Sequence, residues 1–390
     1  MFYKYIIFSL YIFTIKSFKK IFNISIAIFK NQVSGYPEYV INFENKFKKY
    51  VGKKYALTFS NGTSALKSAI FSLGIDKKYK FLVPEYTFHA TIDPVFNLGY
   101  EITFVKVNRY NLSIDIDDLK LKVTNEIKAL IVTHPFGFPA NMEEVSKICL
   151  KNKILLIEDC SHSHGAKFKN EKIGKFSNIS IFSLQGNKSI SAGEGGIALT
   201  NSINYWKKML IYGHFSNRIK DISVSNFTNF TLTGWGEKMR CNPLGILLAQ
   251  EDLLFIDSIN NIKNKIYEYL KMNLKEKKDL FLIKKVNGSI PGGFFSGIPL
   301  IINKNLTENF EKKIKEKKIK IYLDPWIKLD DNKIYNHTFR NNIIKNRFKV
   351  INKSELVSQD VFKEFKVYLI PLPRFLNYDY KKLLKFLNSF

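Results

Sequence analysis

The sequence predicts an α/β fold: a large domain with a mostly parallel sheet flanked by helices, and a smaller C-terminal α+β domain. Short apolar runs typical of buried strands alternate with amphipathic runs typical of helices, beginning with Tyr55–Phe59 and Ser64–Leu73. This alternation favours a parallel sheet covered by helices. The chain has 390 residues, 45% of them hydrophobic, which is enough for two domains with sizeable cores.

The predicted elements follow one another regularly along the large domain. The expected strands are Phe81–Val83, Ile102–Val107, Lys128–Thr133, Ile154–Ile157, Ile179–Leu184 and Gly196–Thr200, and the expected helices are Thr87–Leu98 and Met142–Lys151. Polar residues follow several of these strands, at the sheet edge where ligands bind in such folds.

The pattern changes after about Leu244. A long helix or helix pair is expected over Leu244–Leu274, followed by strands Ile298–Ile302, Lys318–Leu323 and Val367–Ile370 and by lysine-rich helices Glu308–Lys317 and Tyr380–Leu387. We therefore expect an N-terminal extension (1–32), a large domain (33–245) and a small domain (246–390).

The net charge is +27, from 61 lysines and arginines against 34 acidic residues, but only six of the basic residues are arginines. Nucleic-acid readers rely on arginine forks, so scattered lysines do not predict a nucleic-acid partner. Three cysteines without metal or redox spacing argue against a disulfide framework and indicate a reducing compartment, the cytoplasm.

The first thirty residues differ from the rest of the chain. The uncharged apolar run Tyr5–Ile15 is too short to span a bilayer, which needs about 20 residues, and it is followed by Lys16, Lys19 and Lys20. Three interpretations remain: a helix in the membrane interface at the inner face, a helix packed on the body or on a partner subunit, or a signal peptide.

Lys188 lies in the segment Ile181–Gly196, where a strand ends and a glycine-rich turn leads into the next strand. A lysine presented at a strand end can form a Schiff base, although an ordinary surface amine is the plain alternative. Asp159 closes another apolar strand, and a carboxylate there needs a partner such as a protonated ring nitrogen, or else serves as a helix cap or salt bridge.

Two further motifs accompany this pair. Gly62, Thr63 and Ser64 open a helix whose free N–H groups and dipole favour an anion, or they form an ordinary capping turn. His162 and His164 form a His-x-His pair, but no nearby cysteine or carboxylate completes a metal set, so no metal is predicted.

In this order, the motifs resemble the DegT/DnrJ/EryC1/StrS family of pyridoxal-phosphate sugar aminotransferases, which have the fold type I of aspartate aminotransferase. The similarity runs from about Gly35 to Phe390. It is carried by Lys188 with Gly193–Gly196, by Glu158-Asp159 with His162, by Asn61–Leu66, and by two further segments, Pro84–Phe88 and His134–Gly137.

The resemblance implies a pyridoxal 5'-phosphate cofactor and a role for each matching residue. Lys188 would hold the cofactor and shuttle the proton, and Asp159 would pair with the ring nitrogen. The other cofactor-binding residues implied are Gly62, Thr63, Ser64, Phe88, His162, Ser183 and, from the partner subunit of a homodimer, Lys238.

The implied reaction moves an amino group from glutamate or glutamine to a keto-sugar, nucleotide-linked, in amino-sugar or surface-polysaccharide biosynthesis. Lysine at 238, where most relatives have asparagine, resembles a subgroup that includes cyclitol (scyllo-inosose) aminotransferases. The usual His-Tyr-Pro segment is replaced, with Tyr322–Trp326 standing in its place. The alternatives are a cyclitol aminotransferase, a sugar dehydratase, and a non-enzymatic membrane-associated scaffold.

Overall fold

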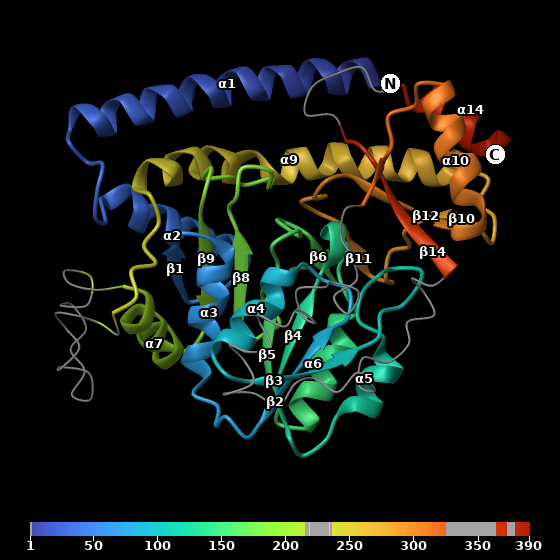
Figure 1. Ribbon diagram of the computed structural model, residues 1–390. Helices are drawn as coiled ribbons and strands as arrows, with labels where there is room; N and C mark the ends of the chain where they lie inside the picture. The colour runs from blue at the N-terminus through green and yellow to red at the C-terminus, as the bar shows by residue number, and fades with distance from the viewer. Residues whose placement is uncertain (1, 215–217, 219–233, 235, 325–363, 373–378) are drawn as a thin grey trace.

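The fold is described by a computed structural model covering residues 2–214, 218, 234, 236–324, 364–372 and 379–390, with side chains from Thr14 onward. The described part contains a seven-stranded sheet in the order β1-β9-β8-β5-β4-β2-β3 (Figure 1). Its strands are β1 (Tyr55–Phe59), β2 (Lys80–Pro84), β3 (Glu101–Val105), β4 (Ile127–Thr133), β5 (Leu155–Asp159), β8 (Ile179–Ser183) and β9 (Gly196–Thr200). Strands β3, β2, β4, β5 and β8 run parallel, and β9 is antiparallel to β8 and β1. The predicted mostly parallel sheet is confirmed.

Helices cover both faces of this sheet. One face packs against α3 (Gly62–Leu73), α4 (His89–Asn97) and α7 (Ile203–Gly213). The other packs against α2 (Glu38–Val51), α5 (Ile116–Lys122), α6 (Met142–Lys151) and the first part of α9 (Pro243–Asn273). The sequence analysis did not predict α2, α5 or α7.

Side chains alternate between the two faces along each strand, as the pleat requires. In β4, Ala129 and Ile131 join the core under α3 and α4, whereas Leu130 and Val132 join the core under α6. The same alternation in β5 sends Glu158 and Asp159 to opposite faces. The ends of β4, β5 and β8 therefore present Thr133, Asp159 and Ser183 toward α3 and α4.

The small domain is built on a four-stranded sheet in the order β10-β12-β14-β13. Its strands are β10 (Leu280–Leu282), β12 (Ile298–Asn303), β13 (Tyr322–Leu323) and β14 (Phe365–Ile370), and its helices are α10 (Lys304–Glu316) and α14 (Tyr380–Ser389). A three-stranded sheet joins β11 (Ser289–Ile290) to β6 (Lys167–Phe168) and β7 (Glu171–Lys172). Of the range Lys318–Leu323, where a strand was expected, only the last two residues form one, because these alone pair with β14.

Helix α9 is one continuous helix shared by the two cores. Ile246 and Ala249 pack in the large-domain core, whereas Tyr267 and Leu270 pack in the core of the small domain. The expected boundary between residues 245 and 246 falls within the first turn of this helix. The domain limits therefore stay a prediction, and the cores are joined by a helix without a linker.

Helix α1 (Phe2–Phe29) runs alongside α9 across the top of the molecule (Figure 1). Lys16 and Lys20 form ion pairs with Asp252 of α9 at 2.6 and 2.8 Å, and Ala27 is buried. This arrangement is the second of the three interpretations, a helix packed on the body. Among the described residues, no helix combines the length and apolarity needed to cross a membrane.

Candidate active site

A cavity of about 380 Å³ opens where β4, β5 and β8 end. Thr133, Asp159 and Ser183, the last residues of these strands, lie in its wall. The start of α3 and the segment from Tyr86 to Thr91 also line the cavity. Ligands of parallel sheets bind at this edge, and the predicted convergence of polar strand ends is found there.

Lys188 projects into the cavity from the loop between β8 and β9. Its backbone N–H donates to the carbonyl of Gln185 at 2.8 Å, and its Nζ lies 3.6 Å from the ring centroid of Phe295. Burial lowers the pKa of Lys188 from 10.5 to about 8, although the charge of Asp159 opposes this shift. A substantial fraction of the amine is therefore neutral near pH 7 to 8, the state needed for attack on a carbonyl.

Asp159 is buried at the end of β5 and is held by two donors. The hydroxyl of Thr91 in α4 donates to Oδ2 at 2.8 Å, and the backbone N–H of Ser161 donates to Oδ1 at 3.1 Å. Both hydrogen bonds fix the orientation of the Asp159 side chain. Asp159 therefore presents a carboxyl group in a fixed position to whatever occupies the cavity.

His162 lies in the cavity wall as a neutral imidazole. Burial, followed by the charge of Lys188, lowers its pKa well below the ordinary value. Its Nδ1 accepts from the backbone N–H of Phe136 at 3.3 Å, so the proton is on Nε2. The imidazole stacks on Phe295, with 4.2 Å between ring centroids and 18° between planes.

The start of α3 forms a cradle suited to an anion. Asn61 caps the helix by accepting from the N–H of Ser64 at 2.7 Å, and Gly62 and Thr63 line the cavity. A Cβ at Gly62 would lie 2.9 Å from the Cβ of Ser183, so glycine is needed for the helix to approach β8. First-turn N–H groups and the serine hydroxyl together suit a phosphate.

The structure brings together most of the predicted site residues. Seven line the cavity: Gly62, Thr63, Phe88, Asp159, His162, Ser183 and Lys188. Ser64 does not line it, because its N–H bonds to Asn61 and its hydroxyl accepts from Ser60 at 3.1 Å. Lys238 is exposed and lies outside the cavity of its own chain. The roles of all these predicted site residues in cofactor binding remain predictions.

Tyr86 connects the cavity to the small domain. Its hydroxyl donates to Oδ2 of Asp324, and both side chains are buried. Asp324 belongs to the segment that stands in place of the expected His-Tyr-Pro motif, of which Pro325 and Trp326 lie outside the described residues. The small-domain segment Tyr322–Asp324 thus contacts the cavity wall through the hydrogen bond between Asp324 and Tyr86.

Sequence reasoning missed Phe295, which comes from a loop between the two domains. The loop approaches His162 closely: Gly293 has a φ of +76°, and a Cβ there would lie 2.3 Å from the carbonyl oxygen of His162. Asn260 accepts from the N–H of Gly293 at 2.8 Å. The signal in the sequence was the glycine pair before two phenylalanines, Gly292–Phe295, which lacks the polar residues that mark a site.

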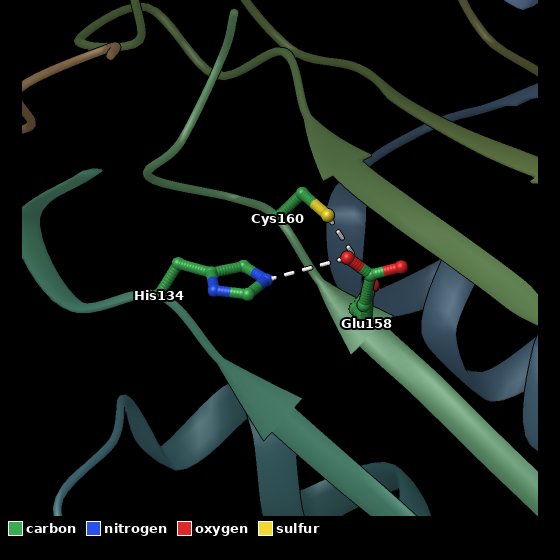
Figure 2. A group of neighbouring side chains, drawn as sticks. All are labelled: His134, Glu158 and Cys160. Carbon is green, nitrogen blue, oxygen red and sulfur yellow. Dashed lines mark hydrogen bonds and ion pairs between the residues drawn. The ribbon is translucent and has the colours of Figure 1, made fainter. Parts of the chain in front are cut away.

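Behind Asp159, on the other face of β5, lies a buried cluster of His134, Glu158 and Cys160 (Figure 2). Nε2 of His134 lies 3.6 Å from Oε1 of Glu158, which also accepts from the N–H of Gly174 at 2.8 Å. Burial would raise the pKa of Glu158, but His134 and Lys53 outweigh it, and the pKa is lowered.

This cluster is better suited to a structural role than to a metal. Nδ1 of His134 accepts from the N–H of Ala140 at 3.1 Å, so Nε2 carries the proton and has no lone pair for a metal. Burial, together with nearby carboxylates, raises the pKa of Cys160 well above its ordinary value, which disfavours the thiolate. In the described part of the chain, His162 and His164 belong to no group suited to a metal.

Comparison with known proteins then decides the family. A family model described as the DegT/DnrJ/EryC1/StrS aminotransferase family matches residues 20–350. The chain belongs to this family. Membership in the DegT/DnrJ/EryC1/StrS aminotransferases confirms the resemblance, the predicted fold and the enzyme class, a pyridoxal-phosphate-dependent aminotransferase.

Three relatives illustrate the match. GDP-perosamine synthase of Escherichia coli O157:H7 is 31% identical over 258 residues, covering 64% of this chain and 68% of the synthase. GDP-4-keto-6-deoxy-D-mannose 3-dehydratase of Escherichia coli O55:H7 is 28% identical over 293 residues, covering 70% and 75%. The aminotransferase from Psychrobacter cryohalolentis has a similar fold, with a TM-score of 0.79 at 19% identity over 95% of each chain.

Proposed function

We propose that this family member transfers an amino group from glutamate or glutamine to a nucleotide-linked keto-sugar, with pyridoxal 5'-phosphate bound in the cavity. The observation that supports this most is Lys188 inside the cavity, with Asp159 in the same wall and a phosphate cradle at the start of α3. The bound cofactor supplies an electron sink for a carbanion.

The residues present fit that cofactor. Gly62 and Thr63 with Ser183 would hold its phosphate, and the absence of a Cβ at Gly62 lets the start of α3 lie close to Ser183. Asp159 would pair with the ring nitrogen, since Thr91 and Ser161 hold its side chain in the cavity wall. Phe88, which is partly exposed in the wall, would cover one face of the ring.

Lys188 would serve as both anchor and acid–base group. A pKa of about 8 lets Nζ accept a proton from the substrate carbon and return it within the same cycle. Nζ is partly buried beside Phe295, which lowers its pKa, and the charge of Asp159 keeps the protonated form accessible. Neutral His162 adds no second positive charge near this amine.

The test of this function is spectroscopic and chemical. The purified protein should show the visible absorption band of lysine-bound pyridoxal phosphate, and Lys188→Ala should lose it. Product analysis with glutamate or glutamine and a panel of nucleotide-linked keto-sugars, GDP-linked ones first, should then show an amino-sugar. A protein that takes up no pyridoxal phosphate would overturn the proposal.

A dehydratase is the second candidate, because one relative that this chain resembles is named as a GDP-4-keto-6-deoxy-D-mannose 3-dehydratase. Lys188 favours transamination, since some relatives that have histidine in place of the Schiff-base lysine are dehydratases. The two reactions differ in their products. In transamination the sugar product contains the nitrogen of the amino donor, whereas dehydration gives a deoxy-ketosugar without that nitrogen. Incorporation of ¹⁵N from labelled glutamate into the sugar separates them.

We also propose a homodimer in which Lys238 reaches the partner's phosphate cradle. Lys238 is exposed, and its neighbour Met239 is fixed beside the cradle by hydrogen bonds to Ser60 and Gly213 at 2.7 and 2.9 Å. Mixing inactive Lys188→Ala and Lys238→Ala subunits should restore activity, because one site of each hybrid is then intact. Absence of restored activity in verified hybrids would contradict a role across the interface.

Contact with a membrane is proposed for the outer face of α1, in the cytoplasm at the inner leaflet. Lys16 and Lys20 point to α9, whereas the exposed face carries Phe18, Phe22 and Phe29 beside Lys19. Aromatic residues next to a lysine suit the interface of an anionic bilayer. Flotation with phosphatidylserine vesicles should recover the protein, and Phe18→Ser with Phe22→Ser should abolish this.

A further inference from the structure

One buried carboxylate connects α1 to the loop that carries Lys188. Oδ1 of Asp252, in α9, accepts from the amines of Lys16 and Lys20 at 2.6 and 2.8 Å. Oδ2 of the same side chain accepts from the backbone N–H of Ser191 at 3.0 Å. Asp252 therefore has α1 on one side and the segment three residues beyond Lys188 on the other.

The Lys188 loop contacts α9 at three residues that follow the lysine, Ser189, Ser191 and Ala192. At Gly245 a Cβ would lie 2.3 Å from the carbonyl oxygen of Ala192, so helix and loop backbones touch. Near the other end, Nζ of Lys263 donates to the hydroxyl of Ser189 at 2.9 Å, and this hydroxyl donates to the carbonyl of Gly293 at 2.6 Å. A change in Asp252 would therefore be passed to the backbone beside Lys188.

The inner face of α1 supplies the charges that this carboxylate needs. Asp252 and Glu251 are both nearly fully buried, and Nδ2 of Asn23 donates to Oε1 of Glu251 at 3.2 Å. A buried carboxylate that loses its cations is left uncompensated, which is strongly unfavourable. With α1 displaced, Asp252 would turn toward water, and this movement would weaken its hold on Ser191.

We propose that Asp252 is a positioning residue for Lys188, and that the seating of α1 on α9 sets the geometry of the Lys188 loop. This proposal rests on the proposed function, since it concerns how the cofactor-binding lysine is held. In this proposal α1 helps to hold the Lys188 loop in position through Asp252. Its outer face remains available for the membrane contact, because the ion pairs use only the inner face.

The test compares three full-length variants. Lys16→Met with Lys20→Met removes the cations but leaves Asp252, and Asp252→Asn keeps an acceptor for Ser191 without the charge. Lys19→Met is the matched control, because this lysine is on the same helix but exposed. Each is titrated with pyridoxal phosphate by its visible band, and the pH midpoint of that band and the hydrogen exchange of residues 185–195 are measured.

We expect the double lysine variant to bind the cofactor about tenfold more weakly, a size typical of coupling between a site and a distant element. Its band midpoint should shift, and exchange in 185–195 should rise, while Lys19→Met matches the wild type. Asp252→Asn should give an intermediate effect. If the double variant fails to fold, Asp252→Asn decides by the same readouts, because it is isosteric.

The proposal is overturned if both variants match the control in cofactor affinity, band midpoint and loop exchange. Loss of thermal stability alone, with these three unchanged, also overturns it, since α1 would then be only a structural helix. Failure of the proposed function looks different, because the wild type itself would then take up no cofactor.

Discussion

The ring of Phe295 lies nearly parallel to the imidazole of His162, with 4.2 Å between centroids, and Nζ of Lys188 lies over the ring at 3.6 Å. One aromatic side chain thus contacts both the neutral histidine and the amine of the cavity. Stacking of this kind contributes about 0.5–1.5 kcal/mol beyond the area buried. Phe295 therefore connects the position of His162 to the environment of Lys188.

Replacing Phe295 with alanine should raise the pKa of Lys188 toward 10.5, since burial is the main cause of its lowering. Phe295→Leu is the control, because it keeps most of the apolar bulk without the aromatic face. The pH dependence of pyridoxal-phosphate uptake should shift upward in the alanine variant and much less in the leucine variant. Equal upward shifts in both would contradict burial by the bulk of Phe295 as the cause.

The rate of cofactor uptake by the wild-type protein should rise with pH and level off above about 8. Only the neutral amine of Lys188 attacks an aldehyde, and its fraction increases as pH passes the lowered pKa. Asp159 opposes the lowering, so Asp159→Asn should move the midpoint below 8. The measurement follows the visible band between pH 6 and 10, and a rate still rising at pH 10 would contradict the lowered pKa.

Thr91→Val should reduce turnover by about tenfold with little change in fold. The variant removes the 2.8 Å hydrogen bond to Asp159, and hydrogen bonds to charged groups contribute about 1.5–3 kcal/mol. Thr91→Ser keeps the hydroxyl and should stay near the wild type. Steady-state kinetics with circular dichroism provides the check. Unchanged turnover in Thr91→Val would contradict a role for the hydrogen bond, and an equal loss in Thr91→Ser would show that the hydroxyl alone is not sufficient.

Glu158→Ala should destabilise the protein by about 1–3 kcal/mol for each donor that loses its acceptor, because it leaves Nε2–H of His134 and the N–H of Gly174 buried and unpaired. Glu158→Gln keeps one oxygen and should lose less. Urea unfolding at neutral pH measures both.

The pH dependence gives a second check on this carboxylate. Because the folded pKa of Glu158 is lowered, its stabilisation is present above the unfolded value and is lost as pH falls through the folded one. The stability difference between wild type and Glu158→Gln should therefore be full at neutral pH and shrink below pH 4.5. A constant difference down to pH 3 would contradict this.

The strands of the large sheet were predictable from sequence because each is a short apolar run between turn residues. Helices α2 and α5 were not, since α2 has three lysines interspersed among its four aromatic residues and α5 has only seven residues. Of the site, Lys188, Asp159 and the start of α3 were predictable because their motifs are local. Phe295 and Thr91 were not, because they reach Lys188 and Asp159 only through tertiary packing.

Continuity of α9 has a consequence for how substrate enters. A hinge between the two domains would have to bend this helix or break its packing in one core, which is costly for a regular helix without a kink. The segment Gly292–Gly297, with left-handed backbone at Gly293 and Phe294, is fixed to the large domain but carries the ring that borders the cavity. We therefore expect access to be controlled by rotation of the Phe295 side chain, on a timescale faster than any domain movement.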